Sequence, residues 1–172
     1  MGYTTDFEGV IGIEPPLNAS EISYLREFNE SRRQKRTKGP LFVGGTGYHG
    51  QGDDSDIIDG NRPDPDQPGL WCQWVPRDDG ADLEWDGVEK FYNAAEWMKY
   101  IVVNLLAPSA QGYVARHVDE DPRLYHFTFN HVLNGVIEAQ GEDPDDMWRL
   151  IVENNVAKVA QTETIYGEAK PI

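Results

Sequence analysis

The sequence has little that would cross-link it or anchor it. Its single cysteine, Cys72, excludes an internal disulfide and makes a cytoplasmic location the default expectation. No apolar run approaches the roughly 20 residues that a membrane helix requires. The first residues, Met1 to Asp6, have neither the basic cluster nor the apolar stretch of a secretory signal. We therefore expect no membrane contact.

Positive charge is also scarce. Fifteen Lys and Arg residues stand against thirty Asp and Glu residues, which gives a formal net charge of −15. A field of that sign repels phosphate backbones, so direct binding of nucleic acid is not expected. Solubility explains such a charge, and so does an acidic surface that meets a basic partner or imitates a nucleic acid.

Metal-binding patterns are missing as well. His117, His126 and His131 lack the spacing that would place two ligands on one helix face, and Cys72 has no second cysteine beside it. We expect neither a metal nor a cofactor.

The 172 residues suit a single domain, residues 1–172, without an internal repeat. Alternation predicts a first strand from Thr5 to Ile13. Asn18 and Glu21 have capping-box spacing and predict a helix that continues to about Gln34. A second helix is expected over Val88 to Leu106, with Asp86 as its cap and Phe91, Ala95, Met98, Val102 and Leu105 on its apolar face.

The remaining pattern is mostly that of strands. A short strand is expected at Leu41 to Val43, and a hairpin pairs Gly69 to Pro76 with Asp82 to Trp85. Asn134-Gly135 reads as a hairpin turn within a C-terminal meander of four strands, and the tail 167–172 is expected to be loose. Together these elements predict an α+β fold, a mainly antiparallel sheet with two helices on one face, in a ferredoxin-like layout with a C-terminal β-meander.

The stretch from Pro68 to Pro108 concentrates tryptophans. Trp71, Trp74 and Trp85 belong to the predicted hairpin, where they either pack in the core or form a stacking platform. Cys72 lies between two of them and is expected to be a buried, unreactive thiol.

The segment 44–69 is a long loop rich in Gly and Asp. A connection of this length is either functional or disordered. Its glycines lack the Lys-Ser/Thr ending of a P-loop, and its aspartates miss the EF-hand pattern, so a solvated acidic loop is expected. Its candidate binding residues are Tyr48, His49, Asp53, Asp54 and Asp56.

Two charged runs complete the candidate binding residues. Arg32 and Arg33 belong to a basic run that reaches Lys38. The helix dipole and pairing with downstream aspartates explain this run, and so does a contact with a phosphate or an acidic partner. The acidic turn contributes Glu142, Asp143, Asp145 and Asp146. No residue is assigned a catalytic role.

Several motifs carry a family resemblance. They are Gly69-Leu70-Trp71-Cys72-Gln73-Trp74, Glu84-Trp85-Asp86-Gly87, Glu89-Lys90-Phe91-Tyr92, Glu96-Trp97, Asn134-Gly135 and the run from Gln140 to Asp146. These motifs resemble a family of small acidic proteins from actinobacteria and their phages. The resemblance implies a bacterial or phage protein of the cytoplasm, or of the host cytoplasm if phage-encoded. The family has no assigned activity, so no catalytic residue is carried over.

Three functions are compatible with these patterns. The first is a non-enzymatic acidic binding protein of phage or mobile-element type that engages a host or defence protein with a basic surface. The alternative is a small-ligand or nucleotide-binding protein, hydrolytic in one version, with a site between loop 44–69 and the Trp-rich hairpin. A third, less expected, is nucleic-acid binding through Arg32 to Lys38.

Overall fold

A six-stranded sheet is the frame of the protein. The computed structural model describes residues 2–163 and 165–171. The sheet consists of β1 (Thr5–Glu14), β4 (Trp74–Pro76), β5 (Asp82–Trp85), β6 (Val132–Gly141), β7 (Met147–Glu153) and β8 (Val156–Gln161). The order is β4-β5-β1-β6-β7-β8, and all neighbours are antiparallel.

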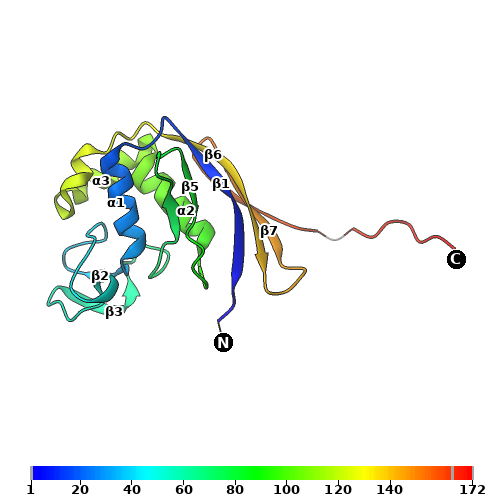
Figure 1. The fold of residues 1–172 in the computed structure, drawn as a ribbon, viewed down its shortest axis with the longest axis horizontal. Helices are drawn as coiled ribbons and strands as arrows, with labels where there is room; N and C mark the ends of the chain where they lie inside the picture. Colours follow the sequence, from blue (N-terminus) through cyan, green and yellow to red (C-terminus); the bar gives the residue numbers. More distant parts are fainter. Residues whose placement is uncertain (1, 164, 172) are drawn as a thin grey trace.

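The helices cover one face of this sheet (Figure 1). They are α1 (Ala19–Glu30), α2 (Ala94–Ile101) and α3 (Gln111–His117). A π-helical turn extends α2, and 3₁₀ turns surround α3; these segments are Val102–Leu106, Pro108–Ala110, Val118–Glu120 and Pro122–His126. The α+β fold with a mainly antiparallel sheet is confirmed, with one more helix than the two expected.

The strand order explains how the sheet is assembled. α1 connects β1 to the β4–β5 hairpin, and α2 begins the connection from β5 to β6. The order β4-β5-β1-β6 therefore matches the ferredoxin-like split β-α-β layout, and β7 and β8 extend it as a meander. The meander has three strands, not four, because residues 127–131 are irregular and Asn134-Gly135 lies within β6 instead of between two strands.

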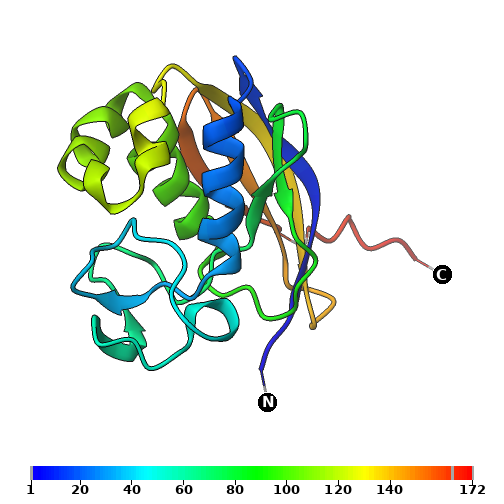
Figure 2. The same ribbon diagram turned by 60° about the vertical axis from the view of Figure 1, so that its left-hand side comes forward.

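A small separate lobe is inserted between α1 and β4. It contains β2 (Gln34–Arg36), the 3₁₀ turn Tyr48–Gly50 and β3 (Ile57–Pro63), and β2 and β3 form their own two-stranded sheet. Figure 2 shows this lobe at the C-terminal end of α1. Hereafter residues 31–73 are called the inserted lobe.

The start of α1 follows its capping residues. The side chain of Asn18 accepts hydrogen bonds from the backbone of Ser20 and Glu21, at 2.9 and 3.0 Å. The Glu21 carboxylate in turn accepts a hydrogen bond from the Asn18 backbone N–H at 2.8 Å, so the predicted capping box is confirmed. The predicted end at Gln34 is wrong, because Ser31 is already extended and Gln34 begins β2.

Other boundaries also differ from the sequence prediction. Leu41 to Val43 is not a strand, although Leu41 and Val43 are buried. The predicted helix from Val88 begins only at Ala94, because Lys90 and Asn93 adopt left-handed backbone angles. Gly69 to Leu70 and the residues up to Gln73 are irregular, and only Trp74–Pro76 is a strand.

Gly135 shows why the predicted hairpin turn at Asn134-Gly135 is wrong. Both residues lie inside β6, where Gly135 pairs with both Ile11 and Val152. Gly135 has φ of 158°, and an added Cβ would lie 2.5 Å from the Val10 carbonyl oxygen. Glycine is therefore required here by the close approach of two strands.

The core lies between the sheet and the helices. The residues of this core with no exposed surface include Ile11, Leu25, Phe28, Trp74, Leu83, Trp97, Met98, Leu105, Leu133, Ile137 and Leu150. The apolar face expected for α2 is present at Met98, Val102 and Leu105, joined by Trp97 and Ile101. None of the helices in the described part of the chain combines the length and the apolarity of a membrane span.

A buried ion pair joins α1 to the segment before β6. Glu21 is 0% exposed and His131 1%, and Oε1 of Glu21 lies 3.1 Å from Nε2 of His131. Nδ1 of His131 lies 2.7 Å from the Pro15 carbonyl oxygen. Nε2 also lies 3.0 Å from the Thr128 hydroxyl. Acceptors at both ring nitrogens favour the doubly protonated imidazole.

The pKa values of the pair follow from this geometry. Burial lowers the pKa of His131, but the bonds to Glu21 and Pro15 outweigh it and raise the pKa above 6.5. Burial raises the pKa of Glu21, but the hydrogen bonds from His131, Asn18 and Thr128 lower it below 4.5. The contribution of His131 to stability is therefore full below pH 6.5 and is lost as the pH rises. That of Glu21 is full above pH 4.5 and is lost as the pH falls.

Replacing His131 should consequently have a pH-dependent effect. The difference in unfolding free energy between the wild type and H131Q should be largest between pH 4.5 and 6.5 and shrink on either side. Urea unfolding at several pH values measures it. The exposed His126 provides the control H126Q, for which the difference should stay small throughout. A difference for H131Q that grows toward pH 9 would contradict the charged pair.

Candidate functional site

The structure divides the predicted binding residues into two separate groups. Arg32, Arg33, Tyr48, His49, Asp53, Asp54 and Asp56 belong to the inserted lobe, and Glu142, Asp143, Asp145 and Asp146 form the turn between β6 and β7. The views in Figures 1 and 2 place that turn at the end of the β6–β7 hairpin, apart from the inserted lobe.

The acidic turn holds the N-terminal segment. The backbone N–H of Thr4 donates to Glu142 at 2.7 Å, and the Tyr3 hydroxyl donates to Asp146 at 2.6 Å. Asp143 lies beside the same hydroxyl, its N–H 3.3 Å away. Asp145 is exposed. Three of these four acidic residues therefore have an internal contact.

Two arginines of the basic run, Arg33 and Arg36, are buried. Arg33 is 3% exposed, lies over the Phe28 ring at 4.6 Å and donates to the Phe42 carbonyl at 2.9 Å. Burial lowers the pKa of Arg33 to about 10. The prediction that Arg33 forms part of a binding surface does not fit this position. The helix-dipole explanation is also wrong, because the last turn of α1 contains no basic residue.

Two of the predicted acidic residues hold Arg36. Its side chain is 3% exposed and lies 2.9 Å from Asp56 and 3.2 Å from Asp54. Asp54 also accepts two hydrogen bonds from Thr46, which together lower its pKa. Segment 44–69 is therefore built around a buried cation, and the expectation of a merely solvated acidic loop is wrong for Asp54 and Asp56.

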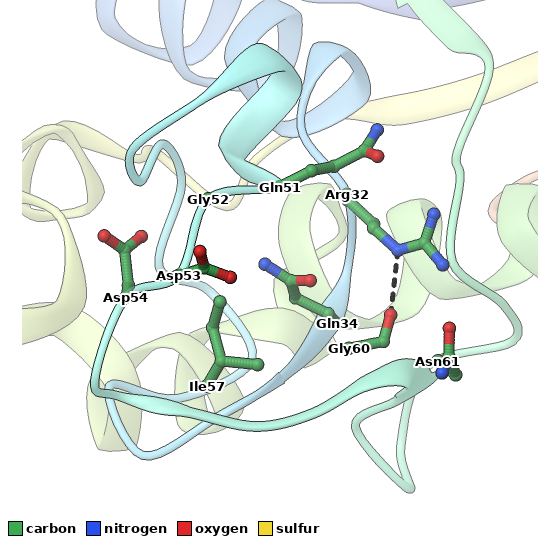
Figure 3. A pocket seen from close by; sticks show the side chains of 9 residues that line it. All are labelled: Arg32, Gln34, Gln51, Gly52, Asp53, Asp54, Ile57, Gly60 and Asn61. Atoms are coloured by element: carbon green, nitrogen blue, oxygen red, sulfur yellow. Dashed lines mark hydrogen bonds between the residues drawn. The ribbon is translucent and has the colours of Figure 1, made fainter.

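A polar cavity of about 510 Å³ opens on the inserted lobe (Figure 3). Arg32 borders it and donates through Nε to the Gly60 carbonyl at 2.9 Å. Asp53 and Asp54 lie on the side opposite Arg32 in Figure 3, with the Gln34 side chain between them. The side-chain nitrogen of Gln34 donates to the Gly50 carbonyl at 2.7 Å, which uses one of its two N–H groups.

A second cavity, of about 610 Å³, lies where the inserted lobe meets the hairpin and the loop before α2. We call it the aromatic cleft. Its rings come from Tyr48, His49, Trp71 and Tyr92, and its charged groups from Glu30, Asp86, Glu89 and Lys90. Asn29, Gln73, Val75 and Val88 also border it, and Gln51 is shared with the polar cavity.

Three segments position the aromatic groups of the cleft. Tyr48 and His49 form part of the 3₁₀ turn, where their ring centroids are 3.8 Å apart. His49 also meets Trp71 edge-on at 5.6 Å. Tyr48 is 79% exposed and Tyr92 55%, together with Val88 at 57%. Exposed apolar groups around a concave surface are typical of binding sites.

The floor of the cleft includes buried polar groups. Asn29 is 5% exposed, and its side-chain nitrogen donates to the Trp74 carbonyl. Its Oδ1 has no hydrogen-bond partner among the described residues. Gln73, 6% exposed, accepts a bond from Trp85 Nε1 at 3.0 Å.

Asp86 has an unusual environment for an exposed residue. The surrounding protein removes water from its carboxyl group, which raises its pKa although the bond from the Val88 backbone opposes the rise. That bond, at 2.9 Å, forms a local turn. Asp86 is therefore not the cap of α2, as the sequence predicted, but a rim residue of the cleft.

The tryptophans have different roles. Trp74 is fully buried, and its Nε1 donates to the Ala94 carbonyl at 2.7 Å. Trp71 is half-buried and borders the cleft, so core packing does not account for it. The binding set predicted from sequence omitted Trp71, Asp86 and Tyr92. Asp86 and Tyr92 were omitted because the sequence analysis assigned them to the cap and the first turns of a helix from Val88, whereas they belong to the loop before α2.

Residues 2–163 and 165–171 contain no group of three or more His, Cys, Asp or Glu side chains placed to hold a metal ion. A comparison with protein-family models, with curated proteins and with solved structures finds no match. The aromatic cleft is therefore judged on its own geometry.

Replacing Arg36 tests whether the inserted lobe depends on its buried cation. R36M should lower the unfolding free energy by at least about 2 kcal/mol, because Asp54 and Asp56 lose their partner. Faster proteolysis between Gly44 and Gly52 should accompany the loss. The control R62M removes an exposed side chain and should change stability by less than about 0.5 kcal/mol. Equal effects would contradict a structural role for Arg36.

Cys72 offers a simpler test of the core beneath the cleft. It is 0% exposed, and burial raises its pKa far above the usual range. The folded protein should therefore not react with a disulfide reagent such as dithionitrobenzoate within hours, whereas the urea-unfolded chain should react at once. Rapid labelling of the folded state would show that the hairpin opens.

Proposed function

We propose that this protein is a non-enzymatic acidic binding protein of phage or mobile-element type, and that it engages a basic host or defence protein through the aromatic cleft. The phage or mobile-element origin comes from the resemblance of the tryptophan and acidic motifs. The cleft is the observation that supports binding.

The composition of the cleft favours a macromolecular partner. Tyr48, Val88 and Tyr92 are more than half exposed and surround one concavity. Aromatic residues dominate the binding energy of protein interfaces, and a buried core within a polar rim is their usual arrangement. Glu30 and Glu89 supply acidic rim groups, which suit a partner with a basic surface.

The positions of the reactive side chains support a non-enzymatic role. Cys72 is buried, and its raised pKa keeps it a thiol. Glu21 and His131 bind each other inside the fold, so neither is available to a substrate. These residues serve stability, which agrees with a protein that binds without a reaction.

A small-ligand protein is the second candidate. The cleft lies between the inserted lobe and the hairpin, and its volume of about 610 Å³ falls within the usual range of roughly 300–1,000 Å³ for ligand pockets. Thermal-shift measurements with nucleotides, cyclic nucleotides and divalent cations separate the two candidates. A raised melting temperature with one of these compounds, lost on replacing Trp71, would favour the small ligand.

Affinity capture tests the binding role. The double variant W71A/Y92A should retain at least about tenfold less of the proteins that the immobilised wild type captures from an actinobacterial lysate, because aromatic contacts dominate interfaces. Capture should also decrease with added salt, since the rim is acidic.

The matched control replaces an aromatic residue outside the cleft. Tyr125 is 63% exposed and bonded only to Asp119 through its hydroxyl, and Y125A should capture the same proteins as the wild type. Circular dichroism would verify that each variant is folded. Undiminished capture by W71A/Y92A would contradict the role of the cleft.

A further inference from the structure

We infer that the aromatic cleft receives a guanidinium group, an arginine side chain of the partner. This inference rests on the proposed function, because it names the chemistry by which the partner would be recognised. It follows from the charge of the rim and the rings of the cleft.

The rim has an excess of negative charge. Glu30, Asp86 and Glu89 stand against one lysine, Lys90, in a chain whose formal charge is −15. An anion would meet carboxylates on entering the cleft, whereas a cation would be attracted to it. Asp86 is exposed and borders the same cavity, so its carboxylate is accessible to such a cation.

The rings of the cleft offer faces to a planar cation. Trp71 is half-buried and lines the cleft together with Tyr48 and Tyr92, and a guanidinium stacks on such rings better than an ammonium does. Arg32 Cζ already lies 6.0 Å from the Trp71 ring, so the partner's guanidinium would use the side of Trp71 away from Arg32 or the exposed rings of Tyr48 and Tyr92.

The same protein shows how it holds an arginine elsewhere. Arg123 lies over the Tyr24 ring at 5.6 Å and bonds Asp121 at 2.7 Å and Glu27 at 2.8 Å. The Arg123 guanidinium is thus held by one aromatic ring and two carboxylates. The cleft contains the same kinds of groups, contributed by separate segments.

The geometry of a guanidinium suits the acidic rim. Its five N–H donors lie in a fixed planar fork, so it can bind more than one carboxylate at once. Glu30, Asp86 and Glu89 supply carboxylate oxygens around the same cavity.

A neutral isostere tests the role of charge directly. The probes are acetyl-Gly-Arg-Gly-amide and the same peptide with citrulline, which has the shape of arginine without its charge. Binding is followed by the NMR signal of the Trp71 indole N–H, assigned with W71F. The arginine peptide should shift this signal with a Kd in the millimolar range, and the citrulline peptide should bind at least about tenfold more weakly.

Rim variants test the direction of the charge effect. D86N should weaken binding of the arginine peptide several-fold, and K90M should strengthen it, because it removes the like charge. The control D145N removes one negative charge from the exposed turn and should change the Kd less than about twofold. The two-dimensional NMR spectrum of each variant shows whether it is folded.

Several results would overturn the inference. They are equal binding of the two peptides, equal effects of D86N and D145N, or no shift of the Trp71 signal with about 20 mM arginine peptide. Its failure can be told apart from failure of the proposed function. Lysate capture that depends on the cleft, with no preference for arginine, would retain the binding role and reject the cation.

Discussion

The carboxylate of Glu21 is the contact on which the arrangement of the layers depends. It accepts hydrogen bonds from the Asn18 backbone, from Thr128 and from His131, so it ties the start of α1 to the segment entering β6. Because a helix is rigid, fixing one end of α1 also fixes the other. At 1.5 Å per residue, that other end lies about 15 Å along the helix from its start. It contributes Asn29 and Glu30 to the aromatic cleft.

A second buried charge organises the inserted lobe. Arg36 bonds Asp54, Asp56 and the Gly50 carbonyl, which draws a glycine-rich segment into a defined turn. That turn presents Tyr48 and His49 to the cleft. A segment with so few apolar side chains has little hydrophobic burial to order it, so paired charges and hydrogen bonds perform that task.

Local signals in the sequence predicted the fold better than the site. The capping box at Asn18 and the alternation of β1 are local, and both were read correctly. Asn134-Gly135 was misread because the need for glycine arises from strand β1, more than a hundred residues away. The site depends on such distant contacts. The apolar face of α2 was correct at Met98 and Leu105, but periodicity could not show that Lys90 and Asn93 turn the chain before the helix.

The distribution of charge relates the buried ion pairs to the proposed binding at the aromatic cleft. Arg33, Arg36 and Arg123 each have contacts within the protein, so their positive charge is directed toward internal rings, carbonyls and carboxylates. Carboxylates such as Glu30 and Glu89 remain on the rim of a concavity lined by rings. These three of the fifteen Lys and Arg side chains thus stabilise the fold, whereas others, such as Arg62 and Arg149, are exposed. A partner that brings its own cation would complete, between two molecules, the contact that Arg123 makes within one.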